Sequence, residues 1–377
     1  MKLGQVFDPR KNALNALRLA LAAEVMLFHS WPITGHMLPK TFLQLLFSIG
    51  VDGFFAISGF LITRSWLTDP RLRDYLAARA LRILPGFYVC LIVTAFGFAP
   101  LSVAIQGGSV ASLLRSTAPL EYVLKNSAVA YLQPNVGATL NGVQGGTAWN
   151  GSLWSLIWEL LCYLAVAGLG VAGLANRRWV SPAILMLATG LATLLPPLTF
   201  PGLWTIPQLA VRSAIMFSAG ALMYQWRDTI PANWSLVAVS VAIVLAANQL
   251  PDYRVVGALP LAYAVIVTGA LLQGRRLRLH TDLSYGVYIY AFPIQRLLAI
   301  CGLSHLQPAL FFLVAATATL PLAAASWFFI EKPSMSLKRR LRRKWSAPVT
   351  SSSEEPPPAS KPSTVVDRAT PGLSETA

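Results

Sequence analysis

Charged residues are scarce in this chain of 377 residues: they make up 12% of the sequence, whereas 55% of the residues are hydrophobic. A soluble globular protein carries about 25% charged residues. So low a share excludes an ordinary soluble domain and indicates a protein that crosses the membrane many times. Acidic residues are the rarer sign, with 15 against 30 basic residues and a net charge of +15. In a membrane protein this excess collects in cytoplasmic loops, so it gives no support to a nucleic-acid partner.

Cysteine and the short motifs of metal and cofactor binding are also rare. The three cysteines, Cys90, Cys162 and Cys301, lie far apart inside apolar runs, and the chain has neither a CxxC nor an HExxH motif. A P-loop and a GxGxxG fingerprint between a strand and a helix are absent as well. Zinc catalysis, ATP hydrolysis and nicotinamide chemistry therefore lack support, and we expect neither a bound metal nor a bound cofactor. The chain also lacks an internal repeat, which is the sequence sign of many transporters.

What the chain does have is long apolar runs. A transmembrane helix needs about 17–25 predominantly apolar residues. Ten runs of this kind lie at 14–34, 42–63, 81–104, 152–174, 179–198, 207–226, 233–249, 256–273, 283–301 and 309–330. Basic residues collect in alternate loops, as the positive-inside rule requires when both termini are cytoplasmic. We therefore predict an all-α, polytopic protein of the lipid bilayer with ten transmembrane helices.

These runs divide the chain into three parts. Residues 1–13 form a cytoplasmic N-terminus, residues 14–335 form the membrane domain, and the Ser-, Pro- and Glu-rich stretch 346–377 is predicted to be a disordered cytoplasmic tail. Within the membrane domain, residues 105–151 make a long outer loop that ends in a Gly- and Asn-rich stretch. Long loops in compact domains are usually functional or disordered, so we interpret this one as a lid or binding wall.

Arg18 and His29 lie eleven residues apart in the first apolar run. On a helix this spacing puts both side chains on one face, about 16 Å apart along the axis. Arg18 would then lie at the inner membrane surface and His29 near the middle of the bilayer. A titratable side chain at that depth is costly and usually functional, although a hydrogen bond to a neighbouring helix is the plainer alternative.

Asp52 lies near the middle of the second run, at a depth that matches His29. Inserting an Asp there costs roughly 2.5–3.5 kcal/mol, so it requires a partner. We predict a His29–Asp52 pair in which the carboxylate fixes the imidazole tautomer, as in a hydrolase triad. A purely structural ion pair is the alternative. Glu24, Arg212 and Arg296 also lie in or near apolar runs, and no role for them follows from the sequence.

Arg79 and Arg82 lie three residues apart at the inner end of the third run. That spacing puts two guanidinium groups on one helix face, where they could bind a phosphate group bidentately. Ordinary positive-inside charge and the binding of lipid headgroups are the alternatives.

Glu159 and Tyr163 lie one helical turn apart near the outer end of the fourth run, after Trp154. Aromatic rings beside a carboxylate suit a sugar, whose C–H faces pack on rings and whose hydroxyl groups need acceptors. We therefore predict that these three residues bind a sugar acceptor in an outward-facing cavity. An interfacial tryptophan belt and a helix–helix hydrogen bond of Glu159 are the alternatives.

Six short motifs give these residues a common context. They are Arg18-x10-His29, GVDGFFAISGFLI at 50–62, Arg79-x-x-Arg82 with the following Ile-Leu-Pro, NGSLWS at 150–155 with Glu159 and Tyr163, SYGVYIYAFP at 284–293 and Glu-Lys-Pro at 331–333. In this order they resemble the integral-membrane acyltransferase-3 family of bacterial polysaccharide O-acyltransferases, over about residues 12–335. The chain departs from that pattern at Leu19, where Gly is common, and at Ala291, where His is common. It is expected to be a stand-alone member without a fused esterase-like domain.

The resemblance implies transfer of an acyl group, usually acetyl, from cytoplasmic acyl-CoA to a hydroxyl of a surface or lipid-linked glycan, in the bacterial inner membrane. Arg79 and Arg82, together with Arg18, would hold the anionic nucleotide end of acyl-CoA. His29, oriented by Asp52, would remove the hydroxyl proton as the oxygen attacks the thioester carbonyl. A covalent acyl-imidazole relay is the alternative route. Whether the protein forms a homo-oligomer stays open.

Two other functions fit parts of the same pattern. A proton-coupled transporter could use a mid-membrane relay of His29 and Asp52, and it would need neither acyl-CoA nor the arginine pair. A non-enzymatic membrane scaffold would tolerate the loss of either residue. The absence of repeats argues against the transporter, and the cost of burying several charges argues against the scaffold.

Overall fold

The computed structural model describes residues 1–37, 40–146, 148–198, 202, 204–274, 277–279 and 281–337, with the backbone alone at 40–44. The predicted tail at 346–377 lies outside the described residues. Within them the chain is helical, and an isolated bridge between Lys2 and Pro231 is the sole β-type pairing. The all-α prediction is confirmed.

Ten longer helices overlap the ten predicted runs. They are α2 (Leu14–Ile33), α3 (Lys40–Thr68), α4 (Leu72–Val93), α8 (Trp154–Val171), α9 (Val180–Leu194), α10 (Ile206–Gln225), α11 (Trp234–Ala247), α12 (Arg254–Leu271), α13 (Ser284–Ile300) and α14 (Pro308–Ser326). In the described part of the chain, six spans are long and apolar enough to cross a membrane, and they contain α3, α4, α8, α10, α12 and α14. The chain is therefore a polytopic membrane protein. The number of crossings and the side of the termini stay predictions.

Short helical segments complete the fold. The helix that starts with α4 continues through the π-helical η1 (Thr94–Phe98) into α5 (Ala99–Ile105), so that one span runs from Leu72 to Ile105. The predicted outer loop holds α6 (Val110–Arg115) and α7 (Ala118–Asn126) before an irregular stretch. The remaining segments are α1 (Leu3–Val6), η2 (Gly151–Leu153), η4 (Leu303–His305) and the π-helical η5 (Trp327–Glu331), which extends α14.

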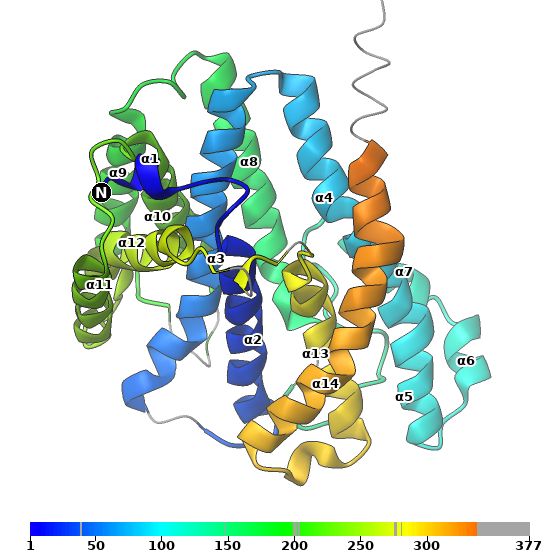
Figure 1. Cartoon of the computed structure of the whole chain (residues 1–377). Coiled ribbons are helices and arrows are strands. Elements are labelled where there is room, and N and C mark those ends of the chain that lie inside the picture. The colour runs from blue at the N-terminus through cyan, green and yellow to red at the C-terminus, as the bar shows by residue number, and fades with distance from the viewer. Residues whose placement is uncertain are drawn as a thin grey trace, which may run out of the picture.

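Helices α9 to α12 gather on one side of the molecule and α4 to α7 on the other, and α2, α3, α8 and α13 lie between them (Figure 1). Helices α3 and α10 pack backbone to backbone in this arrangement. A Cβ atom at Gly59 would lie 2.0 Å from the Phe217 carbonyl oxygen, and one at Gly220 would lie 1.9 Å from the Ala56 carbonyl oxygen. Small residues permit such close approach of membrane helices, so α3 is held firmly against α10 on one flank of the central group.

Candidate active site

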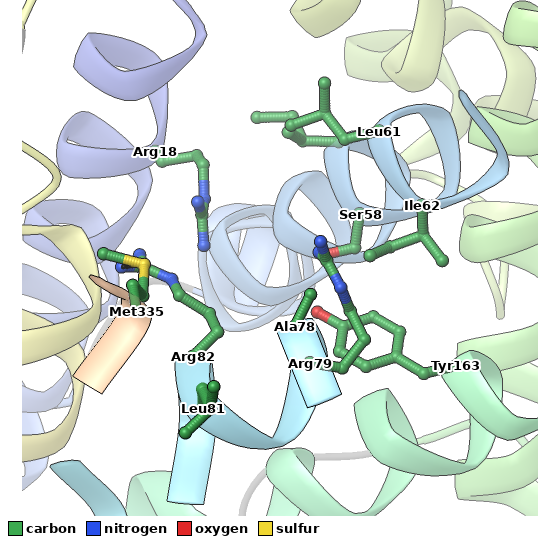
Figure 2. A pocket seen from close by; sticks show the side chains of 11 residues that line it. Arg18, Ser58, Leu61, Ile62, Ala78, Arg79, Leu81, Arg82, Tyr163 and Met335 are labelled. Carbon is green, nitrogen blue, oxygen red and sulfur yellow. Dashed lines mark hydrogen bonds between the residues drawn. The ribbon is translucent and has the colours of Figure 1, made fainter. Parts of the chain in front are cut away.

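A cavity of about 230 Å³ lies where α2, α3, α4 and α8 meet (Figure 2). We call it the inner cavity, after the predicted topology; it is lined by Arg18, Ile57, Ser58, Leu61, Ile62, Ala78, Arg79, Leu81, Arg82, Tyr163 and Met335. Figure 2 shows the guanidinium groups of Arg18 and Arg79 pointing into the space between the helices. The structure thus brings together the three arginines that the sequence singled out for the donor.

Two of these arginines are already paired with carboxylates. Arg18 Nη1 lies 2.7 Å from Asp282 Oδ2, and Arg82 Nη2 lies 2.5 Å from the same oxygen. Arg82 Nη1 also lies 3.4 Å from Glu331 Oε2. Burial acts to raise the pKa of Asp282, but the charges of Arg18 and Arg82 outweigh it and hold this pKa below its usual range. Asp282 is therefore ionised at neutral pH and fixes both guanidinium groups.

Arg79 has no carboxylate partner among the described residues. Its Nε is buried without a hydrogen bond, and its guanidinium carbon lies 6.0 Å from the ring centres of both Tyr75 and Tyr163. Tyr163 donates its hydroxyl to Glu159, which also accepts from Ser58 Oγ at 2.8 Å. An unpaired guanidinium at the wall of a cavity is suited to an anionic ligand.

A narrow void of about 30 Å³, which we call the passage, lies beside the inner cavity; its lining consists of Arg18, Val51, Phe54, Phe55, Ser155, Leu156, Glu159, Tyr285 and Tyr288. Arg18 lines both the inner cavity and the passage. Val51 and Tyr288 line both the passage and a third, larger hollow. A void of this size holds about one water molecule. The three hollows therefore form a row with a constriction in the middle.

The third hollow, which we call the outer cavity, has a volume of about 560 Å³ and a mainly apolar wall that includes several aromatic side chains. Trp154 and Trp204 pack edge to face there, with ring centres 5.6 Å apart. The His29 ring packs against Phe28 and Phe292 at centre distances of 5.4 and 5.0 Å. The outer cavity is thus where the predicted base and Trp154 meet.

The prediction that Glu159 and Tyr163 face the outer cavity together with Trp154 is wrong. Glu159 lines the passage and Tyr163 lines the inner cavity. Helix α8 begins at Trp154, and at 1.5 Å per residue Glu159 and Tyr163 lie about 7.5 and 13.5 Å further along its axis. That distance carries both side chains away from Trp154 and toward the arginines.

His29 Nδ1 lies 2.7 Å from the carbonyl oxygen of Val25, one turn back in the same helix. Because a carbonyl oxygen can only accept, Nδ1 carries the proton and Nε2 keeps its lone pair in the neutral ring. No group in the described part of the chain bonds Nε2. The predicted His29–Asp52 pair is wrong, since the main chain of α2 sets the tautomer. A proton-coupled transporter would need the same His29–Asp52 contact for its relay, and this contact is absent from the described residues.

Asp52 is fully buried in a separate ionic cluster that joins α3, α10 and the start of α12. Its Oδ1 accepts from Arg212 Nε at 2.9 Å, and its Oδ2 accepts from Arg254 Nε at 2.7 Å and from the Tyr253 hydroxyl at 2.5 Å. Arg254 Nη1 lies 3.0 Å from Asp252 Oδ1. Two aspartates and two arginines thus balance each other, and Asp52 holds three helices together.

Arg296 of α13 fastens the glycine-rich end of the outer loop over the outer cavity. Its guanidinium donates to the backbone oxygens of Gln144, Gly145 and Ala148. Gly145, with φ of +88°, and Ala148 line the cavity directly. Burial, opposed by the charge of Arg296, raises the pKa of Tyr131 in the same wall to about 12, so this loop residue contributes a neutral hydroxyl.

The end of the loop is also tied to α13 through Asn150. Pro293 has no backbone N–H, which leaves the carbonyl oxygen of Ile289 without its helical partner. Asn150 Nδ2 donates to that oxygen at 2.8 Å. This bond fixes the turn of α13 that presents Phe292 to His29.

Sequence reasoning missed the roles of four charged residues in these networks. Asp282 and Glu331 hold the donor-side arginines, and Arg212 and Arg254 neutralise Asp52. The available signal for Arg212 was its place inside an apolar run, where a cation requires an anion at the same depth.

Comparison with known proteins agrees with this architecture. The family model described as an acyltransferase domain, acyltransferase 3, matches residues 11–328. An O-acetyl transferase of Shigella phage Sf6 is 28% identical over 349 residues, which cover 86% of this chain and 96% of the relative. Nodulation protein 10 of Rhizobium leguminosarum bv. viciae is 27% identical over 368 residues, covering 88% and 95%. No solved structure shows a significant match. The chain belongs to the acyltransferase-3 family and is a multi-pass membrane acyltransferase.

Proposed function

We propose that this protein transfers an acetyl group from cytoplasmic acetyl-CoA to a hydroxyl of a surface or lipid-linked glycan, in the bacterial inner membrane. The observation that carries the proposal is the row of inner cavity, passage and outer cavity, with arginines at one end and His29 at the other. The name of the phage relative, O-acetyl transferase, supports acetyl as the group and a hydroxyl oxygen as its acceptor.

The donor enters the inner cavity in this proposal. Arg79 is unpaired and meets the phosphates, whereas Arg18 and Arg82, fixed by Asp282, add positive potential at the wall. The thioester then has to travel along the Arg18–His29 face of α2, about 16 Å. The passage has to widen to admit it. Phe54 and Tyr288 both line the passage with ring centres 5.6 Å apart, and rotation of Phe54 is the movement assigned to this opening.

The chemistry takes place at the inner end of the outer cavity. Nε2 of His29 removes the hydroxyl proton while the oxygen attacks the thioester carbonyl carbon. The C–S bond breaks, and the proton passes from His29 to the departing thiolate, so that ester and free CoA thiol leave a neutral histidine behind. The Val25 carbonyl holds Nδ1 throughout and steadies the imidazolium by a charge-assisted hydrogen bond.

The acceptor binds against the aromatic wall of the outer cavity. Trp154 and Trp204 offer ring faces and edges to the C–H surface of a sugar. Gly145 and Ala148, whose backbone oxygens accept from Arg296, line the same space. Glu159 is assigned to the passage and not to the acceptor, because of where it lies.

The experiment compares surface glycans from a deletion strain complemented with wild type, His29→Ala, His29→Gln or His36→Ala. His36 is exposed and lines none of the three hollows, so it is the matched control. Mass spectrometry should show the acetyl group with wild type and the control, and its loss, about 10²-fold or more, with both His29 variants. Near-normal acetylation by His29→Ala in a correctly inserted protein contradicts the proposal.

A second measurement separates the direct transfer from a covalent acyl-imidazole. Labelled acetyl-CoA is added to purified protein without acceptor, and the protein is quenched and analysed for bound label. Direct transfer leaves His29 unlabelled, whereas trapped label on His29 shows the relay.

A further inference from the structure

A fourth hollow, of about 490 Å³, opens beside the inner cavity, on the face that carries the N-terminal segment. It is walled by that segment, the start of α2, the inner half of α3 and residues 278–279, and we call it the side cavity. Leu61 lines both the inner and the side cavity, so the two cavities adjoin at this side chain. Asn15, on its wall, donates to the Leu279 carbonyl oxygen at 3.1 Å and ties α2 to the far wall.

Three arginines, Arg10, Arg64 and Arg278, line the side cavity, and none of them pairs with a carboxylate among the described residues. Arg278 Nε is shielded from solvent without a hydrogen-bond partner. Arg64 has Phe7 as its ring neighbour, at 6.0 Å from the ring centre. Arg18 and Arg82 share Asp282. Among the described residues that line the inner and side cavities, the arginines without a carboxylate partner are Arg79, Arg10, Arg64 and Arg278.

This distribution of charge matches a ligand with two separate anionic groups. An acyl-CoA carries a diphosphate next to its pantetheine arm and a monoester phosphate on the ribose beyond it. Unpaired guanidinium groups bind a phosphate monoester through charge-assisted, often bidentate hydrogen bonds. Arg79 is at the start of the route to His29, which is the place of the diphosphate, and the side cavity lies further from that route.

We infer that Arg64 and Arg278, with Arg10 at the rim, bind the ribose 3′-phosphate of the donor in the side cavity. The inference rests on the proposed function, because it takes acyl-CoA as the donor. It divides the donor site into a diphosphate part at Arg79 and a phosphomonoester part across Leu61. An anionic lipid headgroup offers the same phosphate chemistry, so the test must tell the two sources apart.

The test is a two-by-two comparison of donors and proteins. Acetyl-CoA and acetyl-dephospho-CoA, which lacks the 3′-phosphate, are assayed with wild type and with Arg64→Gln/Arg278→Gln in proteoliposomes of neutral lipid that contain the glycan acceptor. We expect the double variant to raise the KM for acetyl-CoA about 10- to 100-fold. Its KM for acetyl-dephospho-CoA should stay within about twofold of wild type, because this donor has no 3′-phosphate whose binding the two substitutions could weaken.

Arg177→Gln/Arg178→Gln removes the same charge from an exposed loop that lines neither cavity, and it should leave both KM values unchanged. Misfolding lowers turnover with both donors alike, so it does not imitate a donor-specific change. Equal loss with both donors, or no change with either, overturns the inference.

Direct binding separates this inference from the proposed function. Adenosine 3′,5′-bisphosphate, measured by calorimetry, should bind wild type and lose about 10-fold or more in affinity in the double variant. If wild type turns over acetyl-CoA and the double variant instead loses only its stabilisation by vesicles with phosphatidylglycerol, the site serves a lipid headgroup and the inference fails. If wild type turns over no acetyl-CoA at all, the proposed function fails, and the bisphosphate titration still decides the phosphate site.

Discussion

Replacing Asp52 with Asn leaves two fully buried guanidinium groups, those of Arg212 and Arg254, facing an uncharged amide. Removing one partner of a buried ion pair costs about 3–5 kcal/mol. The amide oxygen can still accept one bond, so we expect the lower end, about 3 kcal/mol. At roughly 2–4 °C per kcal/mol, the apparent unfolding midpoint in detergent should fall by about 6–12 °C.

A second substitution tests the reasoning more sharply than the first alone. In Asp52→Asn/Arg212→Met, the cluster keeps the Arg254–Asp252 pair and no excess charge. The double variant should therefore lose less than the sum of the single losses, by about 1–2 kcal/mol. The assay is thermal unfolding of the purified proteins, followed by acetyl transfer at a temperature where all of them stay folded.

The structural role of Asp52 predicts that folded Asp52→Asn keeps most of its activity, because the cluster does not contact His29. An unchanged midpoint together with a rate about 100-fold below wild type would refute this reasoning. It would show that Asp52 acts on the chemistry directly.

Three further predictions concern other parts of the site. Trp154→Ala should raise the acceptor KM about 2- to 12-fold, the equivalent of 0.5–1.5 kcal/mol for aromatic packing, with the donor KM unchanged in the same kinetic assay. The pKa of Asp282 is lowered by folding. Its contribution to stability is therefore complete above the unfolded pKa of about 3.9 and disappears as pH falls through the lower folded pKa. In unfolding experiments, Asp282→Asn should flatten this acidic part of the stability profile and leave the stability independent of pH between about pH 6 and 8. Gly220→Ala should destabilise by about 1–3 kcal/mol, whereas Gly190→Ala, which has open space around it, should not.

The helical architecture was predictable because it follows from one-dimensional patterns. Ten apolar runs overlap ten helices, and Arg18 and His29 do lie in the same helix, α2. The predicted run at 81–104 begins too late, because the helix that contains it starts at Leu72. The first turns of this helix are polar, so they do not appear in an apolar run. Apolar runs indicate the part of a helix that lies in the hydrocarbon core of the membrane, but they do not indicate where the helix begins and ends.

Partners across helices could not be predicted in the same way. His29 and Asp52 were matched by depth, but depth leaves the direction of a side chain around its helix undetermined, and Asp52 points to Arg212 and Arg254 instead. Those residues lie 160 and 202 positions away in sequence. The prediction for Glu159 was wrong for the opposite reason. Its position on the same helix face as Tyr163 was predicted correctly, but its depth along the helix was not.

The constriction between the inner and outer cavities also has an electrical consequence. A hollow of about 30 Å³ is too small for the continuous file of water molecules along which protons and ions would leak. In the proposed reaction, the donor arm fills the space that its entry opens. The proposed reaction path therefore crosses the bilayer without opening a route for protons or ions through the protein.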